Sequence, residues 1–537
     1  MFRLISKHFT NTAILFPSTY GATQATKVNP CSDCEKRQRT KSHPPRNRAN
    51  HTAQSLHSLP PLNEAMGLFD RYFSTIRVVL PYVDEGTIVN LYQGVTQVDL
   101  LKRRRATLAL LNMVWAHAAA SLGSSQRETF YKKAVALMDS RDIERPSYEL
   151  VQTLLLFVEY KQNHQRSISS YTAHALCVKA AFHVGLHSRA ARAASKSPEE
   201  RQLRLRLWNG VLKNERIMNI TQGRPCMIPR SLLADDDVLR QGGSIGDVYL
   251  GTIGPSYAII DKAMDSLYDE NVELGDRSQS QTLLANWTEI SWSIDQFYDS
   301  LSILGGQITR SELPELLAKG PTTHDQSLAV RILLSIHCNR LRLLANFPLI
   351  AHSLSLRLGN HLPEILHEDW EAAWEICSVI SVLGTHSPGF IDELAAWYTC
   401  NYTMLTVTLN FLVILLLKKH DAHILPLTSL AEVRQQIEEA LSVMEQIGKN
   451  SLITQKAGCC IKRMLAVFDN LGAQARVASL SDPGSLSDDF WSTDYVMQDI
   501  ARYSHELLEQ IGRDEGGDSS DLDPSFLDLY SRIPVCE

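Results

Sequence analysis

Apolar side chains recur every three or four positions along most of this chain, which is the spacing of an amphipathic helix. The first clear stripe is expected to end at Pro81, and its members are Phe69, Tyr72, Phe73, Ile76 and Leu80. Further helices are predicted at about 106–121, 126–140, 147–164, 168–186, 198–220, 256–270, 280–304, 325–347, 365–384, 390–419, 428–449, 450–472 and 494–511. Almost no segment alternates with the period of two that a half-buried strand requires. The pattern predicts an all-α fold.

The helix predicted at 198–220 has the clearest start signal. Ser197 suits the N-cap, Pro198 the first helical position, and Glu200 is placed to reach back to the amide of the cap. Apolar residues form one face of this helix: Leu207, Trp208, Val211, Leu212 and Met218. Basic residues form the other: Arg204, Arg206, Lys213 and Arg216. We therefore expect the first face in the core and the second in water. The Asp- and Gly-rich stretch 234–256 reads as looser structure.

Composition separates the two ends of the chain from its helical middle. The chain has 537 residues and a formal net charge of -6, but residues 35–48 are basic and residues 514–537 are acidic. We expect a leader at 1–28, a basic linker within 29–63, one large multi-helical domain at 64–511 and an acidic tail at 512–537. The basic segment and the acidic tail have the composition of disordered chain. The leader lacks carboxylates, as a mitochondrial presequence would, although Pro17 and Gly21 interrupt any amphipathic helix there.

The sequence carries no motif of a common enzyme class. It has no phosphate-binding loop, no dinucleotide-binding glycine pattern, no zinc-protease helix and no nucleophile elbow, so no enzyme is predicted. His117, His174 and His183 lie in predicted helices and read as surface or satisfied core histidines. The apolar run 404–417 is shorter than the roughly 20 residues that span a bilayer, so we expect a buried helix and no membrane partner.

Three segments in order resemble the middle homology region of fungal binuclear zinc-cluster transcription factors. They are residues 130–163, 169–187 and 197–229, and weaker similarity extends over about 64–510. The matching positions are Gly185, Leu186, His187, Leu207, Trp208, Glu215, Arg216, Gly223, Arg224, Pro225 and Ile228. Asn209 stands where the family has a second tryptophan. The resemblance implies a helical regulatory domain, in which we expect Arg216 and Arg224 to have structural roles and the Gly-Arg-Pro turn to end the helix.

The same family binds DNA through six cysteines that hold two zinc ions, and this sequence keeps only part of that pattern. Cys31 and Cys34, with Lys36 and Arg37 after them, resemble the start of the second half. The third cysteine is expected at about 41–43, where the sequence reads Lys-Ser-His. Three explanations stay open: a truncated or mispredicted amino terminus, a member that has lost zinc-dependent DNA binding, or a single site that adds His43 and His51. The incomplete site is not expected to hold a binuclear zinc cluster.

The resemblance implies a nuclear fungal transcription factor that regulates RNA polymerase II genes of a metabolic or secondary-metabolite pathway. Its partners would be DNA, contacted through Lys36, Arg37, Arg39 and Lys41, and a second copy or a relative in a dimer. Coactivators would bind the acidic tail, where Asp alternates with leucine and aromatic side chains. The alternative is a helical interaction protein of the same family that lacks DNA binding.

Overall fold

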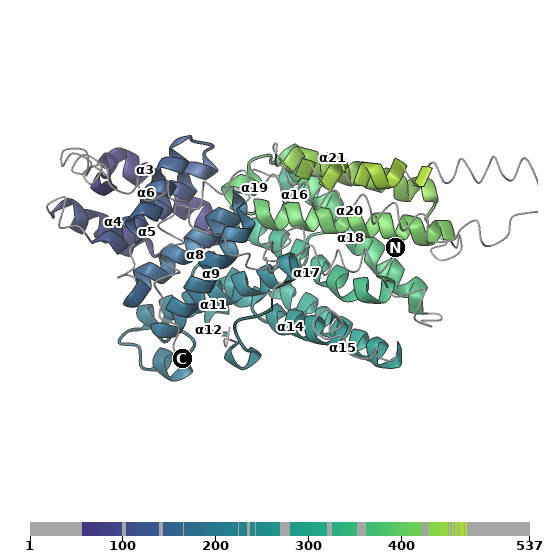
Figure 1. Ribbon diagram of the computed structural model, residues 1–537, viewed down its shortest axis with the longest axis horizontal. Coiled ribbons are helices and arrows are strands. Elements are labelled where there is room, and N and C mark those ends of the chain that lie inside the picture. The colour runs from purple at the N-terminus through teal and green to yellow at the C-terminus, as the bar shows by residue number, and fades with distance from the viewer. Residues whose placement is uncertain are drawn as a thin grey trace, which may run out of the picture.

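The computed structural model is built from helices throughout its described part (Figure 1). It describes residues 56–98, 104–138, 143–164, 166–223, 225–233, 237–241, 243–268, 280–318, 325–351, 361–420 and 428–448, with short stretches between 451 and 469. No β-strand occurs in these ranges, so the all-α prediction is confirmed. The predicted leader, basic segment and acidic tail, and the helix predicted at 494–511, lie outside the described residues.

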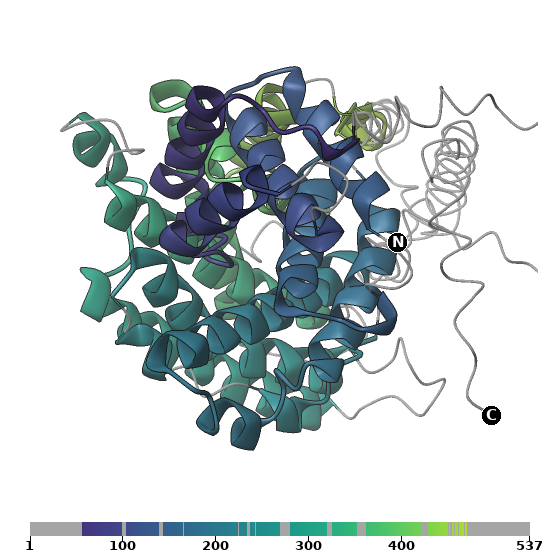
Figure 2. The same ribbon diagram turned by 90° about the vertical axis from the view of Figure 1, so that its left-hand side faces the viewer.

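The first group of helices is coloured purple to blue in Figure 1, and it faces the viewer in Figure 2. It consists of α3 (Leu62–Ser74), η2 (Ile76–Val78), α4 (Glu85–Thr96), α5 (Arg105–Ser121), α6 (Gln126–Leu137), α8 (Tyr148–Asn163), α9 (Ser167–His183), α10 (Arg189–Ala193) and α11 (Pro198–Gln222). The aromatic stripe predicted on the first helix is buried, but the helix ends at Ser74, ahead of the predicted stop at Pro81.

The second group runs from teal to yellow-green. It consists of η4 (Arg230–Leu232), α12 (Asp237–Arg240), α13 (Ile245–Ile253), α14 (Ser256–Leu267), α15 (Ser280–Ser300), η6 (Leu301–Leu304), α16 (Leu313–Ala318), α17 (Gln326–Ala351), α18 (His361–His386), α19 (Phe390–Glu393), α20 (Trp397–His420) and α21 (Leu430–Gly448). The stretch 234–256, predicted to be loose, contains α12 and α13, so that prediction is wrong.

Neighbouring helices mostly pack in sequence order, while α11 and α17 each contact several helices. Helix α11 contacts α8, α9, α13 and α14, and α17 contacts α13, α14, α15, α18 and α20. In Figure 1 both lie near the middle of the long axis. The hydrophobic core is continuous from α3 to α21. Helix α11 thus joins the first group to the second, together with contacts of α13 with η2, of α19 with α5 and of α20 with α8.

Helix α20 contains the strongest apolar run of the sequence and packs against α18 and α21. Residues 397–419 are long and apolar enough to cross a membrane by composition, and 83% of the tested window is buried inside the protein. The prediction of a buried helix at 404–417 is confirmed. Burial against two other helices is the environment of a core helix.

Candidate functional site

The ends of α11 are set by the residues that the sequence indicated. Ser197 Oγ accepts a hydrogen bond from the amide of Glu200 at 3.2 Å. Glu200 Oε2 accepts one from the amide of Lys196 at 2.8 Å, one residue before the amide that was predicted. At the other end Gly223 has φ 54° and ψ 31°, the left-handed conformation of a glycine cap. Arg224 lies outside the described residues.

The apolar face of α11 is buried as predicted. Leu207, Trp208, Val211 and Leu212 have no exposed surface, and Met218 has 1%. The indole nitrogen of Trp208 donates to the carbonyl of Leu232 at 3.0 Å, which satisfies its only polar group. The Leu-Trp pair therefore marks the core of the fold.

The basic face of α11 is also buried, so its predicted exposure to water is wrong. Arg206 is 8% exposed, Lys213 2% and Arg216 0%, and only Arg204 is half-buried. Each buried cation pairs with a carboxylate of another helix: Arg206 with Asp247 of α13, Lys213 with Glu159 of α8 at 2.9 Å, and Arg216 with Asp261 of α14 at 2.7 Å. Burial is possible because the partner neutralises each charge.

One acidic residue of α11 completes this arrangement. Glu215 Oε2 lies 2.6 Å from Nε2 of His174 on α9, and its other oxygen accepts a hydrogen bond from the amide of Met227. Burial alone would raise the pKa of Glu215, but the His174 contact and the Met227 amide together lower it. We call Arg206, Lys213, Glu215, Arg216 and their four partners the α11 charge network. It ties α11 to α8, α9, α13 and α14.

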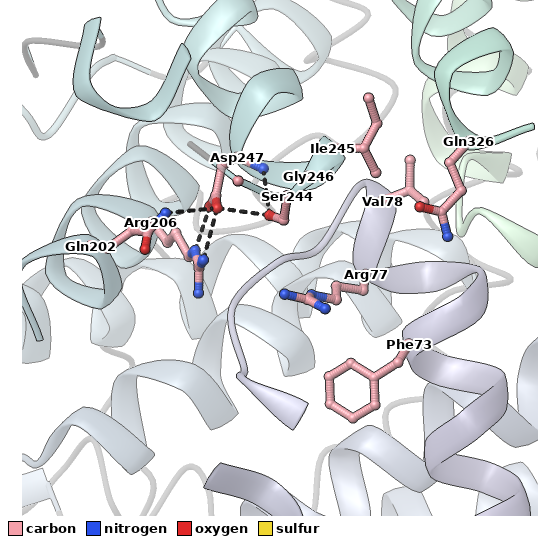
Figure 3. Close-up of a pocket in the computed structure, with 11 residues that line it drawn as sticks. Phe73, Arg77, Val78, Gln202, Arg206, Ser244, Ile245, Gly246, Asp247 and Gln326 are labelled. Carbon is pink, nitrogen blue, oxygen red and sulfur yellow. Dashed lines mark hydrogen bonds and ion pairs between the residues drawn. The ribbon is translucent and has the colours of Figure 1, made fainter. Parts of the chain in front are cut away.

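A pocket of about 420 Å³ opens beside the first pair of this network (Figure 3). It lies between α3 with η2, the first half of α11, the start of α13 and the first residue of α17. Its lining residues are Phe73, Arg77, Val78, Gln202, Arg206, Gly243, Ser244, Ile245, Gly246, Asp247 and Gln326. Gly246 lets α13 come close to η2, because a Cβ there would lie 2.6 Å from the carbonyl oxygen of Arg77.

Most of the pocket's polar groups already have partners inside the protein. Asp247 accepts hydrogen bonds from Nε and Nη2 of Arg206, from Gln202 at 3.0 Å and from the hydroxyl of Ser244 at 2.7 Å. The amide of Gln326 donates to the carbonyl of Ser74 at 2.9 Å and links the start of α17 to the end of α3. The negative charge in the pocket is therefore fully compensated.

Arg77 is the exception. Its guanidinium carbon lies 5.7 Å from the centre of the Phe73 ring, and its Nε is buried without a hydrogen-bond partner. Within the part of the chain that the structure describes, no carboxylate pairs with Arg77. Figure 3 shows its guanidinium extending toward the Arg206–Asp247 pair. Two arginines and one aspartate give the lining a net charge of +1.

The histidines have the roles that the sequence indicated. His117 Nε2 lies 2.8 Å from the carbonyl of Leu156 and is buried, His174 belongs to the charge network, and His183 is exposed. Across the described residues no group of three His, Cys, Asp or Glu side chains is placed to hold a metal ion. The candidate zinc ligands and DNA contacts, Cys31, Cys34, Lys36, Arg37, Arg39 and Lys41, lie outside the described residues.

Sequence reasoning missed Asp247, Arg77 and Gln326. Asp247 falls in the stretch that was read as loose, and its serine cap Ser244 is the signal that could have located α13. Nothing in the sequence marks Arg77 or Gln326, since what distinguishes them is the place where the fold puts them.

Residues 69–240 match the model of the fungal specific transcription factor domain. The chain is also similar to two proteins named transcription factor FBD3. The protein of Fusarium pseudograminearum is 23% identical over 465 residues, which are 79% of this chain and 58% of the relative. The protein of Gibberella moniliformis is 22% identical over 520 residues, 89% of this chain and 66% of the relative. The chain thus spans less than two thirds of the length of these relatives.

The matched range begins in α3 and ends in α12, and it includes all of α11 with its buried tryptophan and charge network. The Gly-Leu-His, Leu-Trp and Glu-Arg positions that carried the resemblance all fall inside it. The predicted resemblance to the middle homology region is therefore confirmed: residues 69–240 of this chain are similar to the fungal specific transcription factor domain.

Proposed function

We propose that the protein regulates transcription in the nucleus of a fungus, acting on RNA polymerase II genes of a metabolic or secondary-metabolite pathway. The described helices form its regulatory body. The observation that carries the proposal is the match over residues 69–240, supported by two relatives that are named transcription factors.

The structure adds a physical reason to favour regulation over turnover. The charged side chains of the α11 charge network form ion pairs and hydrogen bonds with one another. A general acid, base or nucleophile needs to be free to reach a substrate. The buried network instead connects five helices, so that a partner or ligand that shifts one of them would shift the others.

A tethering assay tests this proposal. The full chain would be fused to a bacterial DNA-binding domain in yeast, with the cognate operator placed upstream of a reporter gene. We expect reporter expression to rise or fall several-fold relative to the DNA-binding domain alone. The control is a fusion with Trp208→Ala, which empties the core under α11 and removes the effect together with the fold. An inert wild-type fusion, present in the nucleus in equal amount, would refute the proposal.

For DNA recognition we propose that Lys36, Arg37, Arg39 and Lys41 contact phosphates, and that Cys31 and Cys34 do not assemble a binuclear zinc cluster. The donor set supports the second statement, since two thiolates cannot supply the six that two bridged zinc ions need. Coactivator binding by the acidic tail and association with a second copy or a relative are parts of the same proposal. Metal analysis of the purified full chain tests the zinc statement, and two tightly bound zinc ions per chain would contradict it.

A further inference from the structure

The pocket beside the α11 charge network has the features of a binding site for a small organic acid. We infer that it binds a monocarboxylate, with the guanidinium of Arg77 pairing with the carboxylate and Phe73, Val78 and Ile245 covering the apolar body of the ligand. The effect of the ligand on transcription rests on the proposed regulatory function, whereas its binding does not. Binding itself is a property of the pocket.

Charge is the first argument. A guanidinium that lines a pocket without a carboxylate partner attracts an anion, because pairing restores the hydrogen bonds and charge balance that the protein leaves open. The charge of Arg206 is already balanced, since Asp247 accepts hydrogen bonds from its Nε and Nη2, whereas the charge of Arg77 is not. The first turn of α13 adds partial positive charge at the same wall, where Ile245 and Gly246 line the pocket. The net charge of +1 matches one carboxylate, and a phosphate dianion would leave an excess of negative charge.

Shape and surface are the second argument. A volume of about 420 Å³ falls within the range of small-molecule sites and is too small for a peptide segment with side chains. The pocket combines the Arg77 cation with an aromatic ring and two aliphatic side chains, from Phe73, Val78 and Ile245. Gln202 and Gln326 line opposite sides of the pocket in Figure 3, and either can orient a second polar group of the ligand. This lining suits an acid with a short apolar body.

Position is the third argument. The pocket is formed by segments far apart in the sequence, and Gln326 connects the start of α17 to Ser74 at the end of α3. A ligand between Arg77 and α13 would stabilise the contact of the first helices with α11 and α17. Occupancy would therefore bias the packing of the whole domain, as a population shift requires.

The test measures binding of three monocarboxylates, benzoate, phenylacetate and hexanoate, to the purified full chain. Their neutral amides serve as matched controls at equal ionic strength, and the readouts are the thermal unfolding midpoint and calorimetric titration. We expect at least one acid to bind and to raise the midpoint, with its amide inactive. Arg77→Gln should weaken binding by about ten- to one-hundred-fold, the effect of removing a charge-assisted hydrogen bond.

Further variants separate binding from folding. Arg77→Lys keeps the charge and should retain most of the affinity. Arg342 is the matched control, since its guanidinium lies 5.9 Å from the ring centre of Tyr298 outside the pocket, so Arg342→Gln should bind like the unchanged protein. If Arg77→Gln fails to fold, Ile245→Phe fills the pocket without changing its charge and should abolish binding. The inference is wrong if no acid of the series binds, or if Arg77→Gln and Ile245→Phe bind as tightly as the unchanged protein.

These outcomes are independent of the tethering assay. A chain that binds acids but leaves the reporter unchanged would contradict the proposed function and keep the pocket. A chain that changes reporter expression but binds none of the acids would contradict only the pocket.

Discussion

The buried cations of α11 show how this protein places charge in its core. Arg216 has no exposed surface and donates to Asp261 at 2.7 Å and to the carbonyl of Ile228 at 3.4 Å. The desolvation of two ions is costly, and their attraction offsets that cost only while both partners are present. Removing one charge should therefore destabilise the protein more than the pair stabilises it.

Asp261→Asn tests this argument. The amide keeps the shape of the carboxylate but leaves the Arg216 charge buried without its counterion, so we expect the free energy of unfolding to fall by about 3–5 kcal/mol. Urea unfolding followed by circular dichroism measures the change. The matched control is Glu445→Gln, which breaks the exposed pair with Lys462 at 2.6 Å and should have a much smaller effect. Equal losses in the two variants would contradict a special role for the buried pair.

Arg340 presents the opposite case. It is 5% exposed, and across the described residues no carboxylate or hydrogen-bond partner meets its guanidinium. Burial lowers its pKa from the ordinary value of an arginine to about 10, because the charged form is disfavoured there. Arg340→Met should raise the free energy of unfolding by about 1–3 kcal/mol because it removes a buried charge and keeps an unbranched apolar chain. Arg342→Met, two residues on in α17, removes a surface pair with Asp295 and should give no gain. Urea unfolding of both variants measures the two changes, and a loss of stability in Arg340→Met would contradict the argument.

The two ends of α11 follow local rules, and so they were among the most predictable parts of the fold. Ser197 and Gly223 mark the two ends of α11, as the sequence predicted. Most of the periodic segments from 106 to 448 are helices whose ends lie within a few residues of the predicted ones. Helix α13 was missed because Gly and Asp gave its surroundings a loop-like composition. Its buried contacts with α11 and α17 outweigh that weak local preference.

Two glycines with opposite backbone conformations test the importance of these local rules. Gly223 caps α11 at φ 54°, so Gly223→Ala should lower the free energy of unfolding by about 1 kcal/mol. Gly67 lies on the exposed side of α3, where an added Cβ would have nothing within 4 Å, so Gly67→Ala should raise it by about 0.4–1 kcal/mol. Thermal unfolding of both variants gives the two signs. A shared sign would contradict the assignment of Gly223 as a left-handed cap.

The arrangement of the whole chain decides what the sequence could not show. Periodicity placed Arg206, Lys213 and Arg216 on one face of α11, and that face was expected in water. Their carboxylate partners come from α8, α13 and α14, and only the packing of those helices reveals that the face is buried. The pocket was equally hidden, because its walls combine residues near 73, 202, 245 and 326. Helices follow from local patterns, whereas buried charges and pockets depend on tertiary packing.

The stability of the protein at low pH depends on several buried histidines. Burial lowers the pKa of His117 from 6.5 to about 4, and it lowers those of His164 and His337 from 6.5 to about 3. Each of these histidines takes up a proton near pH 6.5 in the unfolded chain but stays neutral at that pH in the folded chain. Their contribution to stability is thus complete above about pH 6.5 and is lost progressively as the pH falls toward 4 and then 3.

His117→Gln isolates one part of this effect. Glutamine does not titrate and can still donate to the carbonyl of Leu156, which lies 2.8 Å from the imidazole. The unchanged protein should lose about 3 kcal/mol more than this variant when acidified from about pH 6.5 to 4, since each pKa unit corresponds to about 1.4 kcal/mol. Urea midpoints across that range measure the difference, with exposed His183→Gln as the matched control. Parallel pH profiles for His117→Gln and the unchanged protein would show that His117 takes up its proton as readily in the folded chain as in the unfolded chain, and would contradict the burial argument.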